Sequence, residues 1–425
     1  MNAPAMVSGQ AGHRVLNAAH TIRAFLGGLM LLSLPACSLI SNKTDDCCTL
    51  SIRAKVAEET GTVYMSGNID ALGPWRPDGL ALRGEGSWRS VSIDVPRGTE
   101  LEYKFTLGTW DREALGPSGT VMPSFKLFLD QDKAVDHVLD RWRADPREYM
   151  ADWRGSGVQG TLVYWQDMAS DFLDLSRHVV IWLPPGYDPG REEGYPVLYM
   201  HDGQNLFDPR LGGSNGNIWD VDDAVIRLAG QGVIPEIVVV GAFNTADRMW
   251  EYSPWHRAAD YARFLIEELM PRVNSEFNTR PGPQHTGVMG SSMGGLASYH
   301  MVTQHPEVFG SCGCVSSHFP LNEAVLAAFT GIEPAGDASE TPFIVRDIEA
   351  GLTFPKGVRY WFDYGTEGLD GSYGPPHDAL RQAFLDQGWE EGVNFVIREY
   401  QGADHNEASW RDRLEDPLIF MFGDR

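Results

Sequence analysis

The sequence predicts a chain of two folded parts: an all-β sandwich, then an α/β domain built on a mostly parallel sheet. Two observations lead to this expectation. Short β-forming segments separated by Gly and Pro turns occupy residues 50–145. After residue 160, continuous apolar runs typical of buried parallel strands alternate with helical patterns. The 425 residues are enough for such an arrangement.

The expected sandwich, residues 50–145, is of the immunoglobulin-like kind. Turn-forming sequences such as Gly73-Pro74 and Pro96-Arg97-Gly98 separate its β-rich segments. Residues 146–159 are expected to be a linker, because they run from Asp145-Pro146 to Gly155-Ser156-Gly157. The segments expected to be strands are Ser51–Val56, Thr62–Ser66, Ser90–Val95 and Glu102–Thr106.

The α/β domain is expected over residues 160–425. Its strands are predicted from short apolar runs bounded by turn residues, and its helices from the 3.6-residue period. The expected strands are Val179–Leu183, Val197–Tyr199, Ile237–Val240, Thr286–Met289, Cys312–Val315, Tyr360–Phe362 and Phe395–Ile397. The expected helices are Asp220–Ala229, Ala258–Leu269, Gly295–Gln304 and Asp378–Gln387.

The first residues are expected to direct export. Arg14 and Arg23 precede an apolar run, Ala24–Leu34, which is too short to span a bilayer but suits a signal peptide over residues 1–36. Leu34-Pro35-Ala36-Cys37 resembles a bacterial lipobox, in which Cys37 would carry lipid and residues 37–49 would form a tether. The expectation is an exported, membrane-anchored lipoprotein, on the outer membrane or facing the periplasm in a Gram-negative cell. The alternative is an ordinary signal peptide.

Charge and motif content limit the function classes. The formal net charge is −24, which argues against a nucleic-acid partner because phosphate binding needs basic patches. The histidines lack H-E-x-x-H spacing, so we expect neither a catalytic metal nor another cofactor. Cys312 and Cys314 share one face of a predicted strand and are expected to be buried small residues.

The pattern G-x-S-x-G occurs twice, and context separates the two copies. Ser292 follows the predicted strand Thr286–Met289 and precedes a predicted helix, which is the strand–turn–helix setting of a nucleophile elbow. A helix N-terminus there would offer backbone N–H groups to a developing oxyanion. Ser214 has no strand before it and Asn215-Gly216 after it, which favours a structural loop. Ser292 is therefore the predicted nucleophile.

A serine nucleophile needs an imidazole base and an acid that orients it, in the order Ser, acid, His. His405 is the predicted base because it lies in a loop directly after an expected strand. The acid is expected in the loop after the preceding strand, where Asp370 is preferred and Glu367 is the alternative. Asp363 follows the apolar run Tyr360–Phe362 within the strand expected over Val358–Gly365, and it is expected to be structural.

The region from Gly160 to Phe422 resembles the putative-esterase family of α/β-hydrolases, which includes enterochelin, feruloyl and acetyl-xylan esterases, S-formylglutathione hydrolases and mycolyltransferases. The segments that carry this resemblance are Leu183–Asp188, Tyr199–Phe207, Gly290–Gly295, Asp363–Thr366 and Ala403–Glu407.

The resemblance implies particular residues. Members with a similar Gly-Thr-x-x-Leu-Asp loop favour Asp370 as the acid, whereas others have an aspartate where this chain has Gly368. Oxyanion donors would be the N–H groups of Met293 and Gln204. Four further residues are candidates for lining the substrate pocket, with loop packing as the alternative: His201, Asp202, Arg248 and His318. Residues Leu321–Phe354 are expected to be an insertion over the pocket.

The β-sandwich in turn resembles starch-binding carbohydrate modules through Leu72-Gly73-Pro74-Trp75, Trp88 and Glu102-Tyr103-Lys104-Phe105. Its Trp75, Trp88 and Trp110 are candidates for stacking on sugars, with core packing as the alternative. The whole chain is therefore expected to be a serine esterase acting on an acylated carbohydrate or a similar exported ester. The alternatives are a siderophore esterase, an acyltransferase using the same residues, and a non-catalytic carbohydrate-binding lipoprotein.

Overall fold

The computed structural model describes residues 47–73, 75–116, 122–212, 217–330 and 339–423. The expected signal peptide, Cys37, Ser214 and the centre of the expected insertion, residues 331–338, lie outside these ranges.

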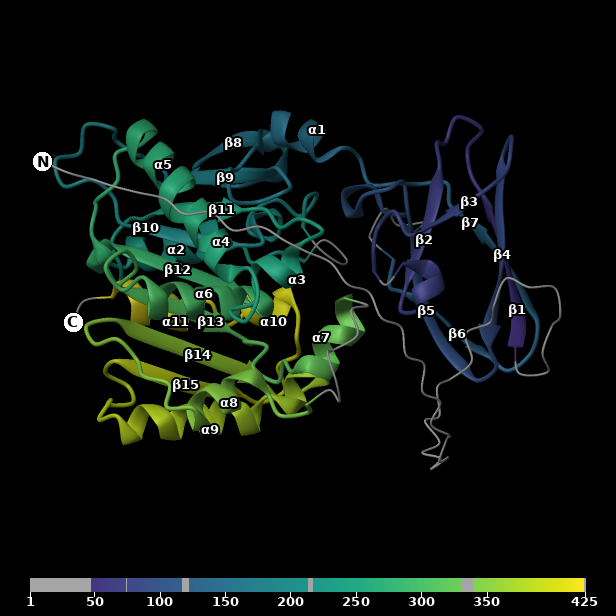
Figure 1. The fold of residues 1–425 in the computed structure, drawn as a ribbon. Coiled ribbons are helices and arrows are strands. Elements are labelled where there is room, and N and C mark those ends of the chain that lie inside the picture. The colour runs from purple at the N-terminus through teal and green to yellow at the C-terminus, as the bar shows by residue number, and fades with distance from the viewer. Residues whose placement is uncertain (1–46, 74, 117–121, 213–216, 331–338, 424–425) are drawn as a thin grey trace, which may run out of the picture. The chain divides into compact units, whose positions relative to one another are not determined.

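The N-terminal region forms two small sheets, drawn purple to blue in Figure 1. One sheet has the order β4-β1-β7 and the other the order β3-β2-β5-β6. Between them lies an apolar core that includes Leu50, Ile52, Met65, Leu101 and Phe105. The strands are β1 (Cys47–Lys55), β2 (Val63–Gly67), β3 (Leu80–Leu82), β4 (Trp88–Pro96), β5 (Thr99–Thr106), β6 (Phe125–Leu129) and β7 (Lys133–Val138).

The secondary structure differs from two expected boundaries in this region. The tether was expected to reach residue 49, but β1 begins at Cys47 because Cys48 is fully buried and pairs with Val95 of β4. The linker expected over residues 146–159 instead contains helix α1 (Pro146–Ala151) and a 3₁₀ turn, Trp153–Ser156. The Asp145 side chain accepts the Arg147 N–H, so Asp145-Pro146 acts as an N-cap and first helical residue.

The C-terminal region is built on an eight-stranded sheet, counted over the described ranges, with the order β15-β14-β13-β12-β10-β11-β9-β8. The neighbouring strands from β15 along the sheet to β11 pair in parallel. Strand β9 pairs antiparallel with both of its neighbours, β11 and β8. This confirms the expected mostly parallel sheet and the α/β class. The strands are β8 (Thr161–Met168), β9 (Arg177–Leu183), β10 (Val197–His201), β11 (Val238–Ala242), β12 (Thr286–Ser291), β13 (Ser311–Val315), β14 (Arg359–Gly365) and β15 (Phe395–Tyr400).

Helices cover both faces of this sheet (Figure 1). One core joins side chains of α4, α6, α8 and α9 to one face of the strands, and a second joins α2, α10 and α11 to the other. The helices are α2 (Val221–Gly230), α3 (Arg248–Glu251), α4 (Ala258–Arg263), α5 (Met270–Glu276), α6 (Met293–Gln304), α7 (Glu323–Thr330), α8 (Phe343–Glu349), α9 (Gly374–Asp386), α10 (Glu407–Arg411) and α11 (Glu415–Phe422).

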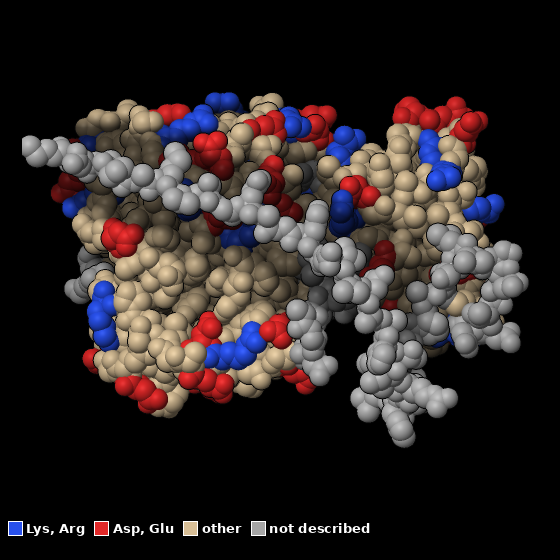
Figure 2. Space-filling view, viewed as in Figure 1, with Lys and Arg blue, Asp and Glu red and all other residues tan. Residues whose placement is uncertain are grey.

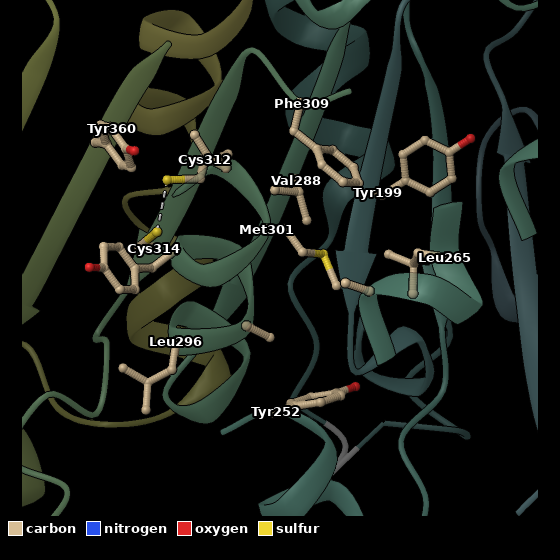
Figure 3. Packing of buried hydrophobic residues seen from close by; sticks show 14 of the residues in the cluster. Tyr199, Tyr252, Leu265, Val288, Leu296, Met301, Phe309, Cys312, Cys314 and Tyr360 are labelled. Atoms are coloured by element: carbon tan, nitrogen blue, oxygen red, sulfur yellow. Dashed lines mark hydrogen bonds between the residues drawn. The ribbon is translucent and has the colours of Figure 1, made fainter. Parts of the chain in front are cut away.

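The first of these cores is drawn in Figure 3, where Tyr199, Val288 and Tyr360 from three strands point toward the helices. Cys312 and Cys314 of β13 lie in it, fully buried with free thiols whose sulfur atoms are 3.0 Å apart. The helix expected over Ala258–Leu269 is longer, because α4 continues through a π-helical segment, Phe264–Leu269, into α5.

On the face drawn in Figure 2, basic side chains are scattered among acidic ones around a largely uncharged surface. None of the helices in the described ranges is long and apolar enough to span a lipid bilayer.

Candidate active site

Ser292 lies at the turn between β12 and α6. Its backbone has φ 56° and ψ −120°, a conformation that is costly for a residue with a Cβ. The Ser292 N–H donates to Val315 O at 3.0 Å, and Ser292 O accepts from the N–H groups of Gly295 and His318 at 3.1 and 3.2 Å. These contacts hold the strained turn at the N-terminus of α6, which is the geometry of a nucleophile elbow.

Close packing explains the glycine two residues before Ser292. A Cβ at Gly290 would lie 2.8 Å from His201 Cδ2 and 2.9 Å from Gly294 C. Because such contacts are too short for a real Cβ, the elbow closes only with glycine here.

His405 and Asp370 meet at the ends of two neighbouring strands. Asp370 is fully buried in the loop after β14, and His405 follows β15. Their Nδ1 and Oδ1 atoms lie 2.6 Å apart. Burial alone would raise the pKa of Asp370, but hydrogen bonds from His405, Ser316 and the Gly365 N–H hold it below its ordinary value. Glu367, the alternative acid, is exposed to solvent.

Tyr373 links the serine to the histidine side of the site. An interaction with the Ser292 side chain lowers the pKa of Tyr373, although burial has the larger, opposite effect. Its ring packs edge-on against His405, with centroids 5.7 Å apart, and its hydroxyl lies 2.5 Å from His318 Nδ1. Burial raises the pKa of Tyr373 and lowers that of His318 to about 4, so both groups are neutral near pH 7. Ser292 and His405 are thus neighbours of the same tyrosine.

Asp202 and Arg248 form a buried ion pair at the end of β10. Arg248 Nε and Nη2 donate to the two Asp202 oxygens at 2.8 and 2.7 Å, and Asn244 Nδ2 donates to Oδ1 at 2.7 Å. Burial alone would raise the pKa of Asp202, but the Arg248 charge and these hydrogen bonds hold it low. Both residues are therefore part of a fixed polar frame beside the site.

His201 is a packing residue. Its Nδ1 lies 3.0 Å from the Tyr261 hydroxyl, and burial lowers its pKa to about 3. The neutral ring fills the space that Gly290 leaves open.

The two expected oxyanion donors lie at the starts of helical turns. Met293 is the first residue of α6, where N–H groups lack intrahelical partners. Gln204 lies in the 3₁₀ turn Gly203–Asn205, and its Oε1 accepts the Asn244 N–H at 3.2 Å. That contact fixes the loop that presents the Gln204 backbone.

Sequence reasoning assigned no role around the triad to Ser316, Tyr373, Arg413, Trp410 or Glu407. Glu407 Oε1 accepts from Asn205 Nδ2 at 3.2 Å, and burial and the Asp202 charge raise its pKa. These residues carry no motif spacing, so only their positions after β13, β14 and β15 could have indicated them. Among the described residues, no group of three or more His, Cys, Asp or Glu side chains is arranged to hold a metal ion.

Two family models match the chain. One, described as "Putative esterase", matches residues 170–421, and one described as "Starch binding domain" matches residues 49–114. The second match agrees with the resemblance seen in the N-terminal sequence.

Relatives and solved structures were also found. An endo-1,4-beta-xylanase/feruloyl esterase of Xylanibacter ruminicola is 30% identical over 281 residues, which are 60% of this chain and 37% of the relative. The uncharacterized protein YbbA of Bacillus subtilis is 27% identical over 175 residues, 37% of this chain and 64% of the relative. The chain thus spans less than two thirds of the length of either relative.

A crystal structure of an enterobactin esterase from Shigella flexneri is 15% identical, covers 89% of this chain and 94% of its own, and has a TM-score of 0.48. Because the first family model spans more than half of the 425 residues, the chain belongs to the putative esterase family.

Proposed function

We propose that this chain is a carboxylic ester hydrolase in which Ser292 is the nucleophile, His405 the general base and Asp370 the orienting acid. The observation that carries the proposal is the 2.6 Å contact between His405 Nδ1 and Asp370 Oδ1, beside a serine held in a strained elbow. Membership of the esterase family supports the same reaction class.

In the proposed mechanism, the ionised Asp370 keeps the His405 proton on Nδ1, so that Nε2 is free to accept a proton. Nε2 takes the Ser292 proton while Oγ attacks the ester carbonyl carbon. The N–H groups of Met293 and Gln204 donate to the resulting oxyanion. His405 then returns the proton to the leaving alcohol, and a water molecule activated in the same way hydrolyses the acyl-enzyme.

The proposed substrate is an ester on a carbohydrate. Support comes from the starch-binding-domain match over residues 49–114 and from the relative whose name joins a xylanase to a feruloyl esterase. A siderophore ester is the competing substrate, since one relative, from Escherichia coli, is named an apo-salmochelin esterase. Acyl transfer to an acceptor other than water would use the same residues.

A second proposed activity is glycan binding by the N-terminal sandwich. Trp88 favours it, because its side chain is 40% exposed at the start of β4, with the Arg53 guanidinium 5.0 Å from the ring. Trp75 and Trp110 are half-buried. Affinity electrophoresis in gels containing amylose or xylan should retard the wild type more than Trp88→Ala. Equal mobility of both proteins in every gel would contradict the assignment.

Export and lipid attachment at Cys37 are proposed on the sequence alone. Intact-mass analysis of protein from a bacterial membrane fraction should find lipid mass on the wild type. Cys37→Ser should leave the membrane fraction and carry no lipid; if it stays with the wild type there, Cys37 is not the anchor.

The deciding test is turnover of p-nitrophenyl acetate, methyl ferulate, acetylated xylan and a catecholate siderophore ester by protein that begins near Cys48. Ser292→Ala should lose activity by about a million-fold, as the loss of a nucleophile does in serine hydrolases. Ser214→Ala, in the other G-x-S-x-G copy, is the matched control and should retain wild-type rates. Equal rates for Ser292→Ala and the wild type would overturn the proposal.

A further inference from the structure

The Ser316 hydroxyl lies directly behind the proposed triad acid. Ser316 follows β13, is fully buried, and has φ 40°, a conformation that is strained for a residue with a side chain. Its Oγ accepts from Trp410 Nε1 at 3.0 Å and from Arg413 Nη2 at 2.6 Å. The same Oγ is hydrogen-bonded to Asp370 Oδ2.

Donor and acceptor counting fixes the direction of that last bond. An indole N–H and a guanidinium can only donate, and a hydroxyl has two lone pairs and one proton. Trp410 and Arg413 therefore use both lone pairs of Ser316, so its proton must point at Asp370. Ser316 is a donor to the carboxylate and cannot act as an acceptor from it.

Asp370 is consequently surrounded by donors. Its Oδ2 accepts from Ser316 and from the Gly365 N–H at 2.7 Å, while Oδ1 faces His405 Nδ1. Neither Ser316 nor the Gly365 N–H can accept, so Asp370 cannot carry a proton on Oδ2. The donors at Oδ2 favour the ionised carboxylate, and the proton between Asp370 Oδ1 and His405 then belongs on Nδ1.

Arg413 supplies the positive charge behind this arrangement. Its side chain is 4% exposed, and its Nη2 lies 2.9 Å from Asp363 Oδ1 and 3.8 Å from Asp370 Oδ2. Asp363 is held in turn by Trp361 Nε1 at 2.7 Å and by the Ser316 N–H at 3.1 Å. One buried cation is thus shared between a structural carboxylate and the proposed catalytic one.

We propose that Ser316 and Arg413 are positioning residues that hold Asp370 ionised and in place against His405, so that the base keeps one tautomer. This inference rests on the proposed function, because it assigns a role around the same triad. Trp410 contacts both Ser316 and His405. Its indole N–H donates to Ser316 Oγ, and its ring packs edge-on against His405, with centroids 5.1 Å apart.

Loss of the Ser316 hydroxyl should change the pH–rate profile. Without the Ser316 donor, the negative charge on Asp370 is less well stabilised, so the Asp370–His405 pair binds its first proton more tightly. The limb on which activity is lost in acid then moves to higher pH. The other titratable groups around the pair would be unchanged, and they are Asp404, Glu407, His318, Tyr373 and His377.

Two substitutions at one position separate the hydroxyl from the backbone strain. Ser316→Ala and Ser316→Gly both remove the donor, but only glycine adopts φ 40° without strain. Both variants should lower kcat about tenfold or more, with little change in KM, because one charge-assisted hydrogen bond to the ionised carboxylate is lost. Both should also shift the acid limb of kcat/KM upward. Arg413→Lys keeps the positive charge but loses the planar guanidinium and its several donors. It should shift the acid limb of kcat/KM by less than the Ser316 variants do.

Ser253→Ala is the matched control, because Ser253 is equally buried and its Oγ bonds His256 Nδ1 at 3.0 Å instead. It should change thermal stability without moving the pH profile. The inference is overturned if Ser316→Ala and Ser316→Gly keep the wild-type kcat and acid limb, or if only Ser316→Ala is impaired, which would indicate strain alone.

A readout independent of turnover keeps this inference distinguishable from the proposed function. The downfield proton of His405 Nδ1–H, assigned by its loss in Asp370→Asn, should move in both Ser316 variants and stay in Ser253→Ala. If the wild type is inactive on every ester but the proton signal moves in both Ser316 variants, only the esterase proposal is overturned. An active wild type whose proton is unchanged in both Ser316 variants would overturn this inference alone.

Discussion

Arg248 donates hydrogen bonds from two nitrogens to the Asp202 carboxylate, at 2.8 and 2.7 Å. Asp202 lies where β10 ends and the turn containing Gln204 begins. Asp202 is nearly fully buried and has φ 58°, so the chain reverses sharply at an ionised side chain. Asn244, which also binds Asp202, donates its backbone N–H to Gln204 Oε1. The ion pair and the proposed oxyanion loop are therefore one connected unit.

Replacing Arg248 should affect stability and catalysis together. Arg248→Gln leaves a buried carboxylate with an incomplete set of donors, and breaking such a pair costs about 3–5 kcal/mol in full burial. Because the Arg248 side chain is 25% exposed, we expect about 2 kcal/mol, measured by urea unfolding. kcat should also fall as the loop loosens.

Arg263→Gln is the control, since its pair with Glu267 on one helix is about half exposed on both sides. It should cost less than about 0.5 kcal/mol. Equal losses for the two variants would show that the Asp202 pair is no more than a surface salt bridge.

The two candidate acids give opposite predictions. Asp370→Asn should lower kcat by about ten-thousand-fold, because the amide no longer selects the required imidazole tautomer. Glu367→Gln, at an exposed position three residues earlier, should retain activity. Steady-state rates on one good ester decide between them, and inactivation by Glu367→Gln but not by Asp370→Asn would reverse the assignment.

Acid should destabilise the fold through buried neutral histidines. Burial lowers the pKa of His201 to about 3 and those of His318 and His377 to about 4, whereas an unfolded histidine titrates near 6.5. Between those values the unfolded chain binds protons that the native protein does not, so stability decreases as pH falls from 6.5 toward 4.

Each such histidine contributes a slope of up to about 1.4 kcal/mol per pH unit in that window. Urea unfolding at several pH values should give this slope, and His377→Gln should reduce it by the contribution of one proton. A slope that is the same in His377→Gln and the wild type would mean that the buried histidine titrates normally.

Local patterns were sufficient for most of the C-terminal sheet. Runs such as Val179–Leu183 and Cys312–Val315 are apolar throughout because both faces of the sheet are covered, and each lies within an observed strand. β8 was missed because polar residues interrupt it, with Gln166 and Asp167 at its exposed end. β3, with three residues, is too short for a periodic signal.

Some residues of the candidate site could likewise be predicted from local patterns, and others could not. Ser292, Asp370 and His405 each follow a strand with a readable pattern, so their positions could be predicted, and their catalytic roles stay predictions. The roles of Ser316 and Arg413 behind Asp370 could not be predicted, because their contact joins distant parts of the chain. The two residues are 97 positions apart. No spacing rule connects a serine after one strand to an arginine near the C-terminus; only the assembled sheet brings them together.

Tyr373 offers a test of how the nucleophile is oriented. Its hydroxyl contacts Nδ1 of His318, whose ring is neutral near pH 7, and it interacts with the Ser292 side chain. We expect this interaction to restrict the rotation of Ser292 Oγ and to favour the rotamer that can donate to His405. Tyr373→Phe removes that restraint while keeping the ring against His405, so kcat should fall about tenfold with KM nearly constant, the effect of one hydrogen bond.

Tyr364→Phe provides the comparison, because Tyr364 is also buried and its ring contacts His377 instead of His405. It should leave kcat close to the wild-type value. Single-turnover measurements with p-nitrophenyl acetate would place the Tyr373→Phe defect in acylation, the step in which Ser292 attacks. If Tyr373→Phe acylates at the wild-type rate, the tyrosine is a packing residue and Oγ is oriented by His405 and the elbow alone.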